Sequence, residues 1–314
     1  MNIIPVPSAA QLPVKTVQHL PWTIAERVFV IAEVGINHNG DMAVAKQLID
    51  AAHAAGCDAV KFQKRSIDVV YSADVLAQPR QSPWGSTQRE QKEGLEFGEA
   101  EYDQIDAYCR ELGIDWFASA WDVDSQTFLA KYKLKYNKIA SAMITNRAVV
   151  EAVAAEKKLT FLSTGMSTIH EVDAAVEIFR EHDCPFILMH TVSTYPTAEN
   201  ELNLMTLQTL ARRYGAAVGY SGHEASMEPS VLAALLGAVA IERHITLDRA
   251  MYGSDQSASL EPAEMTALVS RMRALPSLIG DGEKRVTEGE QAVASKLRYW
   301  PQDETISAHK DAAA

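Results

Sequence analysis

Residues 238–249 read AVAIERHITLDR, an apolar run that ends in a glutamate, an arginine and a histidine. Short apolar runs bounded by turn residues are typical of buried strands. Such a strand does not normally end in three ionisable side chains, because an unpaired buried charge costs several kcal/mol. The stretch therefore predicts a strand whose carboxyl end lies in a polar site.

Seven similar runs precede it, at 29–35, 58–63, 115–119, 137–142, 160–165, 185–191 and 216–222. The intervals between the runs mostly carry helical patterns, including 170–182, 203–215 and 225–237. In 41–56, Asp41 is placed to cap the start of a helix and Gly56 its end. Eight alternating strands and helices predict a single α/β domain, a (β/α)8 TIM barrel. An open doubly wound sheet is the alternative, although no G-x-G-x-x-G motif follows the first strand.

The barrel is expected to span residues 28–300. Residues 1–27 contain several prolines and predict an extended N-terminal arm, and residues 301–314 predict a flexible tail. The longest interval between strands holds QPRQSPWGSTQRE (78–90). Long loops inside compact domains are often functional, so we expect a substrate lid here, with a plain surface loop as the alternative.

The composition limits the classes of partner. Apolar residues make up 47% of the 314-residue chain, and the formal net charge is -12. A chain this acidic is not expected to bind nucleic acid or an anionic membrane. No apolar run approaches the ~20 residues of a membrane span, and the first residues do not resemble a signal peptide. We expect a cytoplasmic protein in which Cys57, Cys109 and Cys184 are reduced and structural, with a reactive thiol as the alternative.

Polar side chains recur where the predicted strands end. They are Glu33, Lys61, Gln63, Lys64, Ser119, Lys138, Ser141, Ser163, Thr164, His190, Ser221, His223, Glu242 and His244. Because active sites of α/β barrels lie at the carboxyl ends of the strands, this set predicts one. Lys61 and Lys138, with a row of hydroxyls, suit a small ligand that carries a phosphate and a carboxylate. The alternative is that these lysines form buried salt bridges with Glu33 or Glu242.

His223 and His244 end consecutive strands. Neighbouring strands lie ~4.8 Å apart, so the two imidazoles could share one divalent metal and leave other coordination positions open. Hydrogen-bonded core histidines are the alternative. The spacing does not choose between Mn²⁺, Mg²⁺, Co²⁺ and Zn²⁺.

Several motifs in series resemble the sialic acid synthase family. They are IAEVGINHNGD (31–41), VKFQ (60–63), KIAS (138–141), LSTGM (162–166), HTVSTYPT (190–197), VGYSGH (218–223), IERHITLDR (241–249) and SASLEP (257–262). The resemblance covers about residues 29 to 290. It implies condensation of phosphoenolpyruvate with an N-acylmannosamine or related aldose to a 3-deoxy-2-keto acid, with release of phosphate by C–O cleavage. It also implies a divalent ion, usually Mn²⁺ (Mg²⁺ and Co²⁺ being possible), and a homodimer.

The resemblance assigns roles residue by residue. His223 and His244 match metal ligands. Phosphoenolpyruvate-binding positions match Lys61, Lys138, Ser141, Ser163 and Ser221, and positions near the reacting centre or the sugar match Glu33, Gln63, Tyr195 and Asp255. We expect Glu33, Lys61, Lys138 and His244 to be catalytic. Glu33 is expected to act as the general base for the attacking water, with a structural pairing to Lys61 as the alternative.

Two departures from the family concern the acceptor sugar. Met143 stands where the family carries an acidic residue, and the chain is expected to lack the small C-terminal antifreeze-like domain of many members. We therefore expect a weaker requirement for the 2-acetamido group of the sugar. Two other functions stay open: a Schiff-base aldolase with Lys138 or Lys61 as nucleophile, and a non-catalytic sugar-phosphate-binding subunit.

Overall fold

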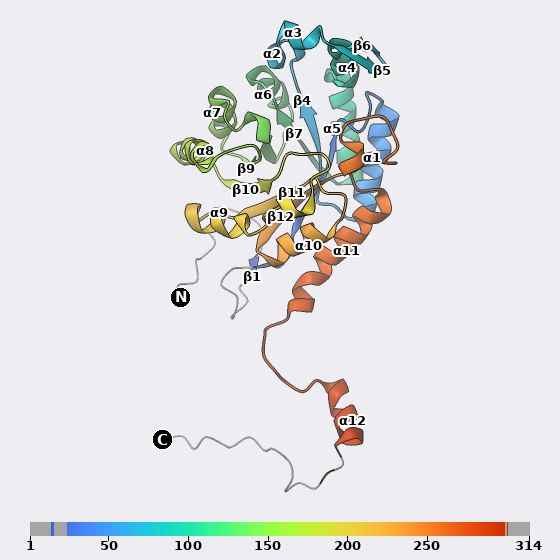
Figure 1. The fold of residues 1–314 in the computed structure, drawn as a ribbon, viewed down its shortest axis with the longest axis vertical. Coiled ribbons are helices and arrows are strands. Elements are labelled where there is room, and N and C mark those ends of the chain that lie inside the picture. The colour runs from blue at the N-terminus through green and yellow to red at the C-terminus, as the bar shows by residue number, and fades with distance from the viewer. Residues whose placement is uncertain (1–13, 16–23, 299, 301–314) are drawn as a thin grey trace. The chain divides into compact units, whose positions relative to one another are not determined.

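Within the residues that the computed structural model describes (14–15, 24–298 and 300), eight parallel strands close into a barrel (Figure 1). In chain order they are β3 (Phe29–Gly35), β4 (Ala59–Lys64), β7 (Asp115–Ala120), β8 (Tyr136–Ile139), β9 (Leu159–Ser163), β10 (Phe186–Thr191), β11 (Val218–Gly222) and β12 (Ala238–His244). The pairing of β9 with β10 completes the ring. The predicted TIM barrel is confirmed, and the open sheet is excluded.

Helices surround the strands in Figure 1. They are α1 (Met42–Ala55), α5 (Glu99–Leu112), α6 (Val123–Leu129), α7 (Arg147–Ala155), α8 (Ile169–Glu181), α9 (Thr206–Tyr214), α10 (Glu228–Leu235) and α11 (Pro262–Ile279). Both predicted caps of α1 are confirmed, since Asp41 Oδ1 accepts from Ala43 N at 2.6 Å and Gly56 adopts a left-handed φ of 81°. The helix predicted at 225–237 begins at Glu228 instead, where Pro229 occupies the first turn.

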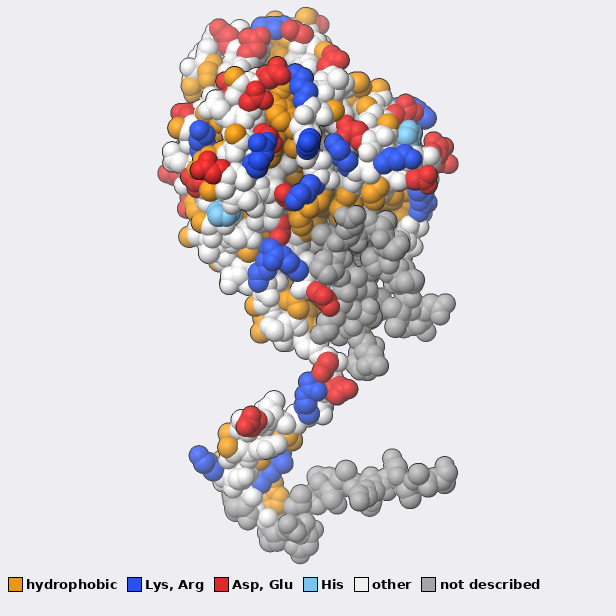
Figure 2. Space-filling view, turned by 180° about the vertical axis from the view of Figure 1, so that it is seen from behind, with side chains coloured by type: hydrophobic (Ala, Val, Ile, Leu, Met, Phe, Trp, Pro, Cys, Tyr) orange, Lys and Arg blue, Asp and Glu red, His pale blue; other side chains and the backbone are white. Residues whose placement is uncertain are grey.

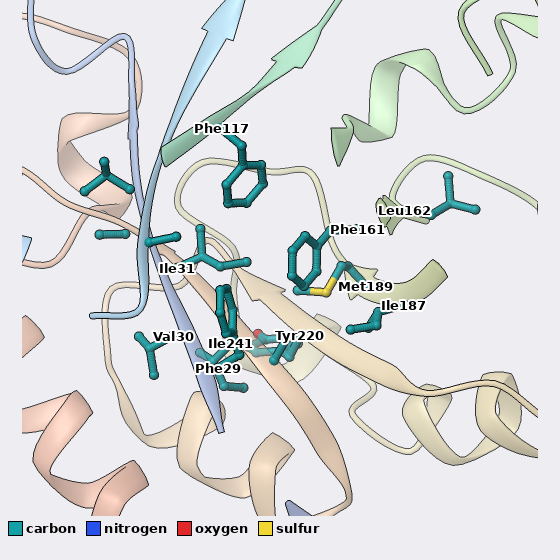
Figure 3. Close-up of a cluster of buried hydrophobic side chains, with 14 of the residues drawn as sticks. Phe29, Val30, Ile31, Phe117, Phe161, Leu162, Ile187, Met189, Tyr220 and Ile241 are labelled. Atoms are coloured by element: carbon teal, nitrogen blue, oxygen red, sulfur yellow. The ribbon is translucent and has the colours of Figure 1, made fainter. Parts of the chain in front are cut away.

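The interior of the barrel changes from apolar to polar along the strands. Near the amino ends, Phe161 packs against Phe29 and Phe117 with ring centroids 5.7 and 5.5 Å apart (Figure 3). Side chains of a strand alternate between its two faces, so Ser119 and Ser163 follow two residues later on the same side. The aromatic layer closes the bottom of the barrel and leaves polar side chains at the carboxyl end.

The segment between β4 and β7 forms a folded excursion, which Figure 1 shows beyond the carboxyl end of β4. It contains α2 (Ile67–Val70), α3 (Ala73–Leu76), β5 (Pro79–Ser82), β6 (Gly85–Thr87) and α4 (Gln88–Leu95). The loop predicted at 78–90 is instead an antiparallel hairpin followed by the first turn of α4. A Cβ at Gly94 would overlap the ring of Trp84, and one at Gly40 would overlap the carbonyl of Gly94. The excursion is therefore packed closely onto the β3–α1 loop.

The two ends of the chain differ from the predicted boundaries. In the expected arm, β1 (Val14–Lys15) pairs antiparallel with β2 (Ile24–Ala25), while residues 1–13 and 16–23 lie outside the described residues. The chain divides into two units, Met1–Gly280 and Asp281–Ala314, so the barrel unit ends before the boundary expected at 300. In the second unit, α12 (Glu288–Leu297) buries none of its residues, and the predicted tail at 301–314 lies outside the described residues.

The remaining short elements are the 3-10 helices η1 (Ser141–Met143), η2 (Glu199–Glu201) and η3 (Gln256–Ala258). No helix in the described part of the chain has the length and apolar character needed to cross a membrane. Cys57, Cys109 and Cys184 are all buried and free. Burial raises the pKa of the Cys57 thiol to about 12, that of Cys109 to about 12 and that of Cys184 to about 11, which favours the structural interpretation over reactive thiols.

Candidate active site

A pocket of about 210 Å³ opens at the carboxyl end of the barrel. All but one of the predicted site residues line it: Glu33, Lys61, Gln63, Lys138, Ser141, Ser163, Tyr195, Ser221, His223 and His244. The exception is Asp255, whose Oδ2 lies 3.8 Å from His244 Nδ1. The structure thus brings together side chains from all eight strand ends or the loops that follow them, and we call this space the catalytic pocket.

Strand β12 carries its three ionisable side chains, Glu242, Arg243 and His244, on two different faces. Glu242 and His244 point into the catalytic pocket. Arg243 is fully buried on the other face, where its Nη1 lies 2.9 Å from Glu224 Oε1 and donates to the carbonyl of Ser226 at 2.8 Å. The alternation of a β-strand explains the division. Arg243 is paired with Glu224, and Glu242 and His244 face the catalytic pocket. An otherwise apolar strand can therefore end in three ionisable residues.

Glu242 belongs to the polar set predicted at the strand ends, but the sequence analysis gave it no role in binding or catalysis. Its Oε1 lies 3.4 Å from Lys61 Nζ, and its Oε2 lies 2.7 Å from Lys138 Nζ. Ser221 Oγ donates a hydrogen bond to Oε1 at 3.1 Å. Lys61 also lies 3.1 Å from Glu33 Oε2. The salt bridges considered as the alternative for both lysines are therefore present. Two ammonium groups and two carboxylates give this buried cluster a net charge of zero.

The cluster keeps its charges by mutual attraction. Burial opposes the ionised carboxylate of Glu242, but Lys138 and Lys61 outweigh it and hold its pKa at about 2. Burial also opposes the Lys61 ammonium, yet Glu242 and Glu33 raise its pKa above the ordinary value. For Lys138 burial prevails, helped by the nearby Lys61 charge, and lowers the pKa to about 8. Of the two lysines, Lys138 is therefore the one that loses its proton more readily.

Glu33 is fixed by two neighbours. Besides the ion pair with Lys61, its Oε1 accepts a hydrogen bond from Gln63 Nε2 at 2.8 Å. The other side of the Gln63 amide accepts from the Arg65 guanidinium. Glu33 is thus a buried carboxylate that lines the pocket and has a fixed orientation, as a general base requires, while the structural pairing with Lys61 is also present.

The rings of His223 and His244 are tilted by 55° to each other, with centroids 5.4 Å apart. His223 Nδ1 lies 2.8 Å from the carbonyl of Val192, and because a carbonyl can only accept, this nitrogen carries the proton. Its Nε2 is then an acceptor, which the hydroxyl of Tyr195 reaches at 3.0 Å. Burial, followed by the nearby His244, lowers the pKa of His223 to about 3, so the ring is neutral at physiological pH.

These features suit a metal ligand pair. A neutral imidazole whose Nδ1 is held by a backbone carbonyl offers its Nε2 lone pair to a ligand partner, and His244 Nδ1 is buried without a hydrogen-bond partner. No group of three or more His, Cys, Asp or Glu side chains placed to hold a metal occurs in the part of the chain that the structure describes. An ion here would have two protein nitrogens and several open positions, as a Lewis-acid site needs.

Lys64, His190 and Met143 do not line the catalytic pocket. Lys64 pairs with Glu96 at 2.7 Å, and His190 Nε2 bonds the carbonyl of Leu202 at 2.7 Å, so both have structural partners. Met143 packs partly buried against the hydrophobic core and does not line the catalytic pocket. Trp121, Thr191 and Ser193 do line it, although nothing in the sequence singled them out.

Comparisons with known proteins agree with this geometry. Residues 48–284 match the model of the NeuB family. The N,N'-diacetyllegionaminic acid synthase of Legionella pneumophila is 35% identical over 86% of this chain and 78% of its own. The N-acetylneuraminate-9-phosphate synthase of Drosophila melanogaster is 39% identical over 79% of this chain and 68% of its own. The crystal structure of a sialic acid synthetase from Leptospira borgpetersenii superposes with a TM-score of 0.76 at 31% identity, over 92% of this chain and 99% of the other.

Proposed function

Because the chain belongs to the NeuB family, we propose that it condenses phosphoenolpyruvate with an aldose to give a 3-deoxy-2-keto acid of the sialic acid type. The resemblance indicated by the sequence motifs is thereby confirmed. The observation that carries the proposal is the catalytic pocket itself, which combines two buried lysines, a row of hydroxyls and a buried histidine pair. The roles of the individual site residues remain predictions.

Phosphoenolpyruvate carries a phosphate and a carboxylate. We expect Lys61 and Lys138, which line the catalytic pocket, to bind these groups together with the hydroxyls of Ser141, Ser163 and Ser221. The lysines are already neutralised by Glu33 and Glu242. A multiply charged anion is therefore bound well only if another positive charge is present.

We propose that His223 and His244 hold this charge as a divalent ion, Mn²⁺ by preference, with Mg²⁺ or Co²⁺ as substitutes. The ion would polarise the aldehyde of the acceptor and stabilise the negative charge that develops on its oxygen. The carbonyl of Val192 holds the Nδ1 proton of His223 and so leaves Nε2 of that ring as the ligand atom. We expect Tyr195 OH, which donates to His223 Nε2, to bond an acceptor hydroxyl.

The reaction proceeds by attack of C3 of phosphoenolpyruvate on the acceptor aldehyde. Water then adds at C2, and the tetrahedral intermediate loses inorganic phosphate by cleavage of its C–O bond. Glu33 accepts the proton of the attacking water, while Lys61 and Gln63 hold its carboxylate in place. With phosphoenolpyruvate labelled at the bridging oxygen, the label should leave with phosphate, and a label retained in the keto acid would exclude this route.

The acceptor is proposed to need its 2-acetamido group less than sialic acid synthases do. The catalytic pocket contains two carboxylates, Glu33 and Glu242, among the described residues, and both are paired with lysines. Met143, at the position of the family's acidic residue, packs on the core. A kcat/KM for N-acetylmannosamine more than about a thousandfold above that for mannose, ~4 kcal/mol, would contradict this proposal.

A Schiff-base aldolase is the second candidate, favoured by one observation. Burial lowers the pKa of Lys138 to about 8, and an amine with a lowered pKa is the usual nucleophile of such enzymes. Its 2.7 Å ion pair with Glu242 argues for the protonated form instead. EDTA should silence phosphate release by the proposed synthase but not an aldolase, whereas borohydride with a keto acid should trap only the aldolase.

The deciding assay measures phosphate release from phosphoenolpyruvate with a panel of aldoses, with and without Mn²⁺. Release that needs both an aldose and the metal supports the synthase. Binding of phosphoenolpyruvate without any release would instead support the non-catalytic subunit.

We also propose a cytoplasmic homodimer. The outer helices α10 and α11 expose large apolar side chains, with Leu232 51% and Leu278 78% accessible, which a second subunit could cover. Light scattering during gel filtration tests the dimer.

A further inference from the structure

A buried ion pair lies beside the two histidines of the catalytic pocket. Arg243 Nη1 is 2.9 Å from Glu224 Oε1, and both side chains are fully buried. Glu224 directly follows His223 in the sequence, and Arg243 directly precedes His244. The ion pair therefore joins the segment that carries one histidine to the segment that carries the other, and we call it the buried bridge.

Further hydrogen bonds fix both members of the buried bridge. Tyr220 OH donates to Glu224 Oε2 at 2.7 Å. Arg243 Nη1 donates to the carbonyl of Ser226 at 2.8 Å and to Ser230 Oγ at 3.1 Å, and its Nη2 donates to the carbonyl of Glu224. One guanidinium thus holds three positions between residues 224 and 230, where the chain leaves β11 and enters α10.

The backbone ladder between β11 and β12 ends one residue before the histidines. Its last paired residues are Gly222 and Arg243. His244 lies inside β12, whereas His223 lies beyond the end of β11. The carbonyl of Val192 orients the His223 ring but belongs to neither strand. Beyond the ladder the two segments are linked through the Arg243 guanidinium, so the position of His223 relative to His244 depends on the buried bridge.

The buried bridge lies where stability alone does not require charge. Removing two charges from water costs several kcal/mol per ion, and their attraction often only offsets that cost, so a well-packed apolar pair is commonly as stable. The backbone nevertheless makes room for the carboxylate, since a Cβ at Gly222 would lie 2.7 Å from both oxygens of Glu224. An apolar pair cannot supply the directed hydrogen bonds that one guanidinium makes with several acceptors. The buried bridge therefore contributes geometry more than stability.

We propose that Arg243 and Glu224 are positioning residues that hold His223 and His244 at the spacing that one divalent ion requires. This inference rests on the proposed function, which assigns the two imidazoles to the metal. Neither residue of the buried bridge lines the catalytic pocket, so each acts through the histidine next to it in the chain. A metal site tolerates errors of only about 0.5 Å in the placement of its ligands, so loss of the buried bridge should weaken binding of the ion.

The test removes both charges of the buried bridge together. In the double variant Glu224→Met, Arg243→Met, apolar side chains fill the space and no buried charge is left unpaired, so the metal-free chain should keep its thermal midpoint within about 5 °C. Calorimetry with Mn²⁺ alone should show at least about tenfold weaker binding, the scale for losing a group that orients a metal ligand.

Arg273→Met is the matched control. Arg273 pairs with Asp58 at 2.8 Å, directly before β4 and so at the amino end of the barrel strands. This variant also breaks an arginine–carboxylate pair, but far along the strands from the histidines. It should lower the thermal midpoint and leave the affinity for Mn²⁺ unchanged.

Tyr220→Phe is a milder variant that keeps the inference testable if the double variant does not fold. It removes only the hydroxyl that fixes Glu224 Oε2, and it should weaken Mn²⁺ by about threefold, because a single hydrogen bond is worth less than the ion pair. A folded double variant that binds Mn²⁺ with wild-type affinity would overturn the inference. If the double variant does not fold, wild-type affinity in Tyr220→Phe would overturn it.

Crystal structures of the metal-free chains separate this inference from the proposed function. The centroids of the two imidazole rings, 5.4 Å apart in the wild-type chain, should move by more than about 0.5 Å in the folded variants of the buried bridge. If no aldose condenses but the rings move and Mn²⁺ affinity falls, the proposed function fails and the positioning role stands. If an aldose condenses while ring spacing and Mn²⁺ affinity stay at the wild-type values in these variants, the function stands and the positioning role fails.

Discussion

At the scale of the residue, neighbouring side chains on one strand serve different purposes. Glu242 and His244 enter the catalytic pocket, while Arg243 between them holds the loop after β11 through Glu224 and Ser226. Since that loop begins at His223, the outward arginine supports the same histidine pair that the inward residues approach. Three consecutive residues therefore provide both side chains of the catalytic pocket and a support for the loop beside it.

Replacement of either histidine should remove the metal. In His223→Ala and His244→Ala, we expect no detectable Mn²⁺ binding by calorimetry and at least a hundredfold lower turnover, about the cost of losing electrophilic stabilisation of a developing oxyanion. His170→Ala is the control, because His170 is an exposed histidine on α8. Full metal occupancy in both pocket variants would show that the pair is structural.

Deprotonation of Lys138 should lower the activity of the enzyme at alkaline pH. Its pKa is lowered to about 8, so the side chain is charged below that pH and becomes neutral above it, whereas Lys61, whose pKa is raised, stays charged. We expect kcat/KM for phosphoenolpyruvate, which reports the free enzyme, to fall above about pH 8.

Lys138→Met tests this assignment. It should weaken phosphoenolpyruvate by ~2–4 kcal/mol on the acid side and abolish the alkaline fall, since one partner of a desolvated charge pair is removed. Lys131→Met, at an exposed lysine that pairs with Glu99, should keep the wild-type profile. A flat wild-type profile up to pH 9.5 would contradict the role.

At the scale of the element, strands and helices were predictable where the pattern is local. The strands 29–35 and 238–244 have the predicted bounds because apolar runs and turn residues mark both ends. The polar ends of the strands were predictable from the alternation of side chains. Glu33 and Glu242 were predictable as possible partners of the two lysines. That Glu242 pairs with both lysines was not, because this depends on strand register across the barrel, which no local pattern contains.

The hairpin β5–β6 was missed for a different reason. Its residues PRQS and GST begin with proline and glycine, which usually indicate loops. A proline is tolerated at the start of an edge strand, and the packing of Trp84 on Gly94 stabilises the hairpin from outside its own sequence. Tertiary contact thus decides the structure of this element.

Gly94→Ala should loosen the folded excursion. The added Cβ overlaps the Trp84 ring, and overpacking of this kind costs about 1–3 kcal/mol. We expect faster amide hydrogen exchange over residues 84–95 and a lower urea midpoint. Gly289→Ala, at a helical glycine with nothing within 4 Å of the added atom, should leave both unchanged. Unaltered exchange in Gly94→Ala would mean that the hairpin is not held by this contact.

At the scale of the whole molecule, charge is distributed unevenly. On the face shown in Figure 2, Lys and Arg side chains alternate with Asp and Glu side chains over the barrel unit. Against a net charge of -12, the catalytic pocket is balanced, because Lys61 and Lys138 pair with Glu33 and Glu242. The molecule as a whole repels anions, so selective binding of an anionic substrate depends on the local charges of its site.

Residues up to Gly280 should fold without the residues that follow them. They form one compact unit that contains the described hydrophobic core and every described residue of the catalytic pocket. A chain ended after Gly280 should therefore keep its thermal midpoint within about 2 °C and bind phosphoenolpyruvate with unchanged affinity, because none of the described core residues is removed. Scanning calorimetry and titration of the shortened and full chains measure both quantities. A shortened chain that melts more than about 5 °C lower at the same protein concentration would show that residues 281–314 pack against a partner subunit or the barrel.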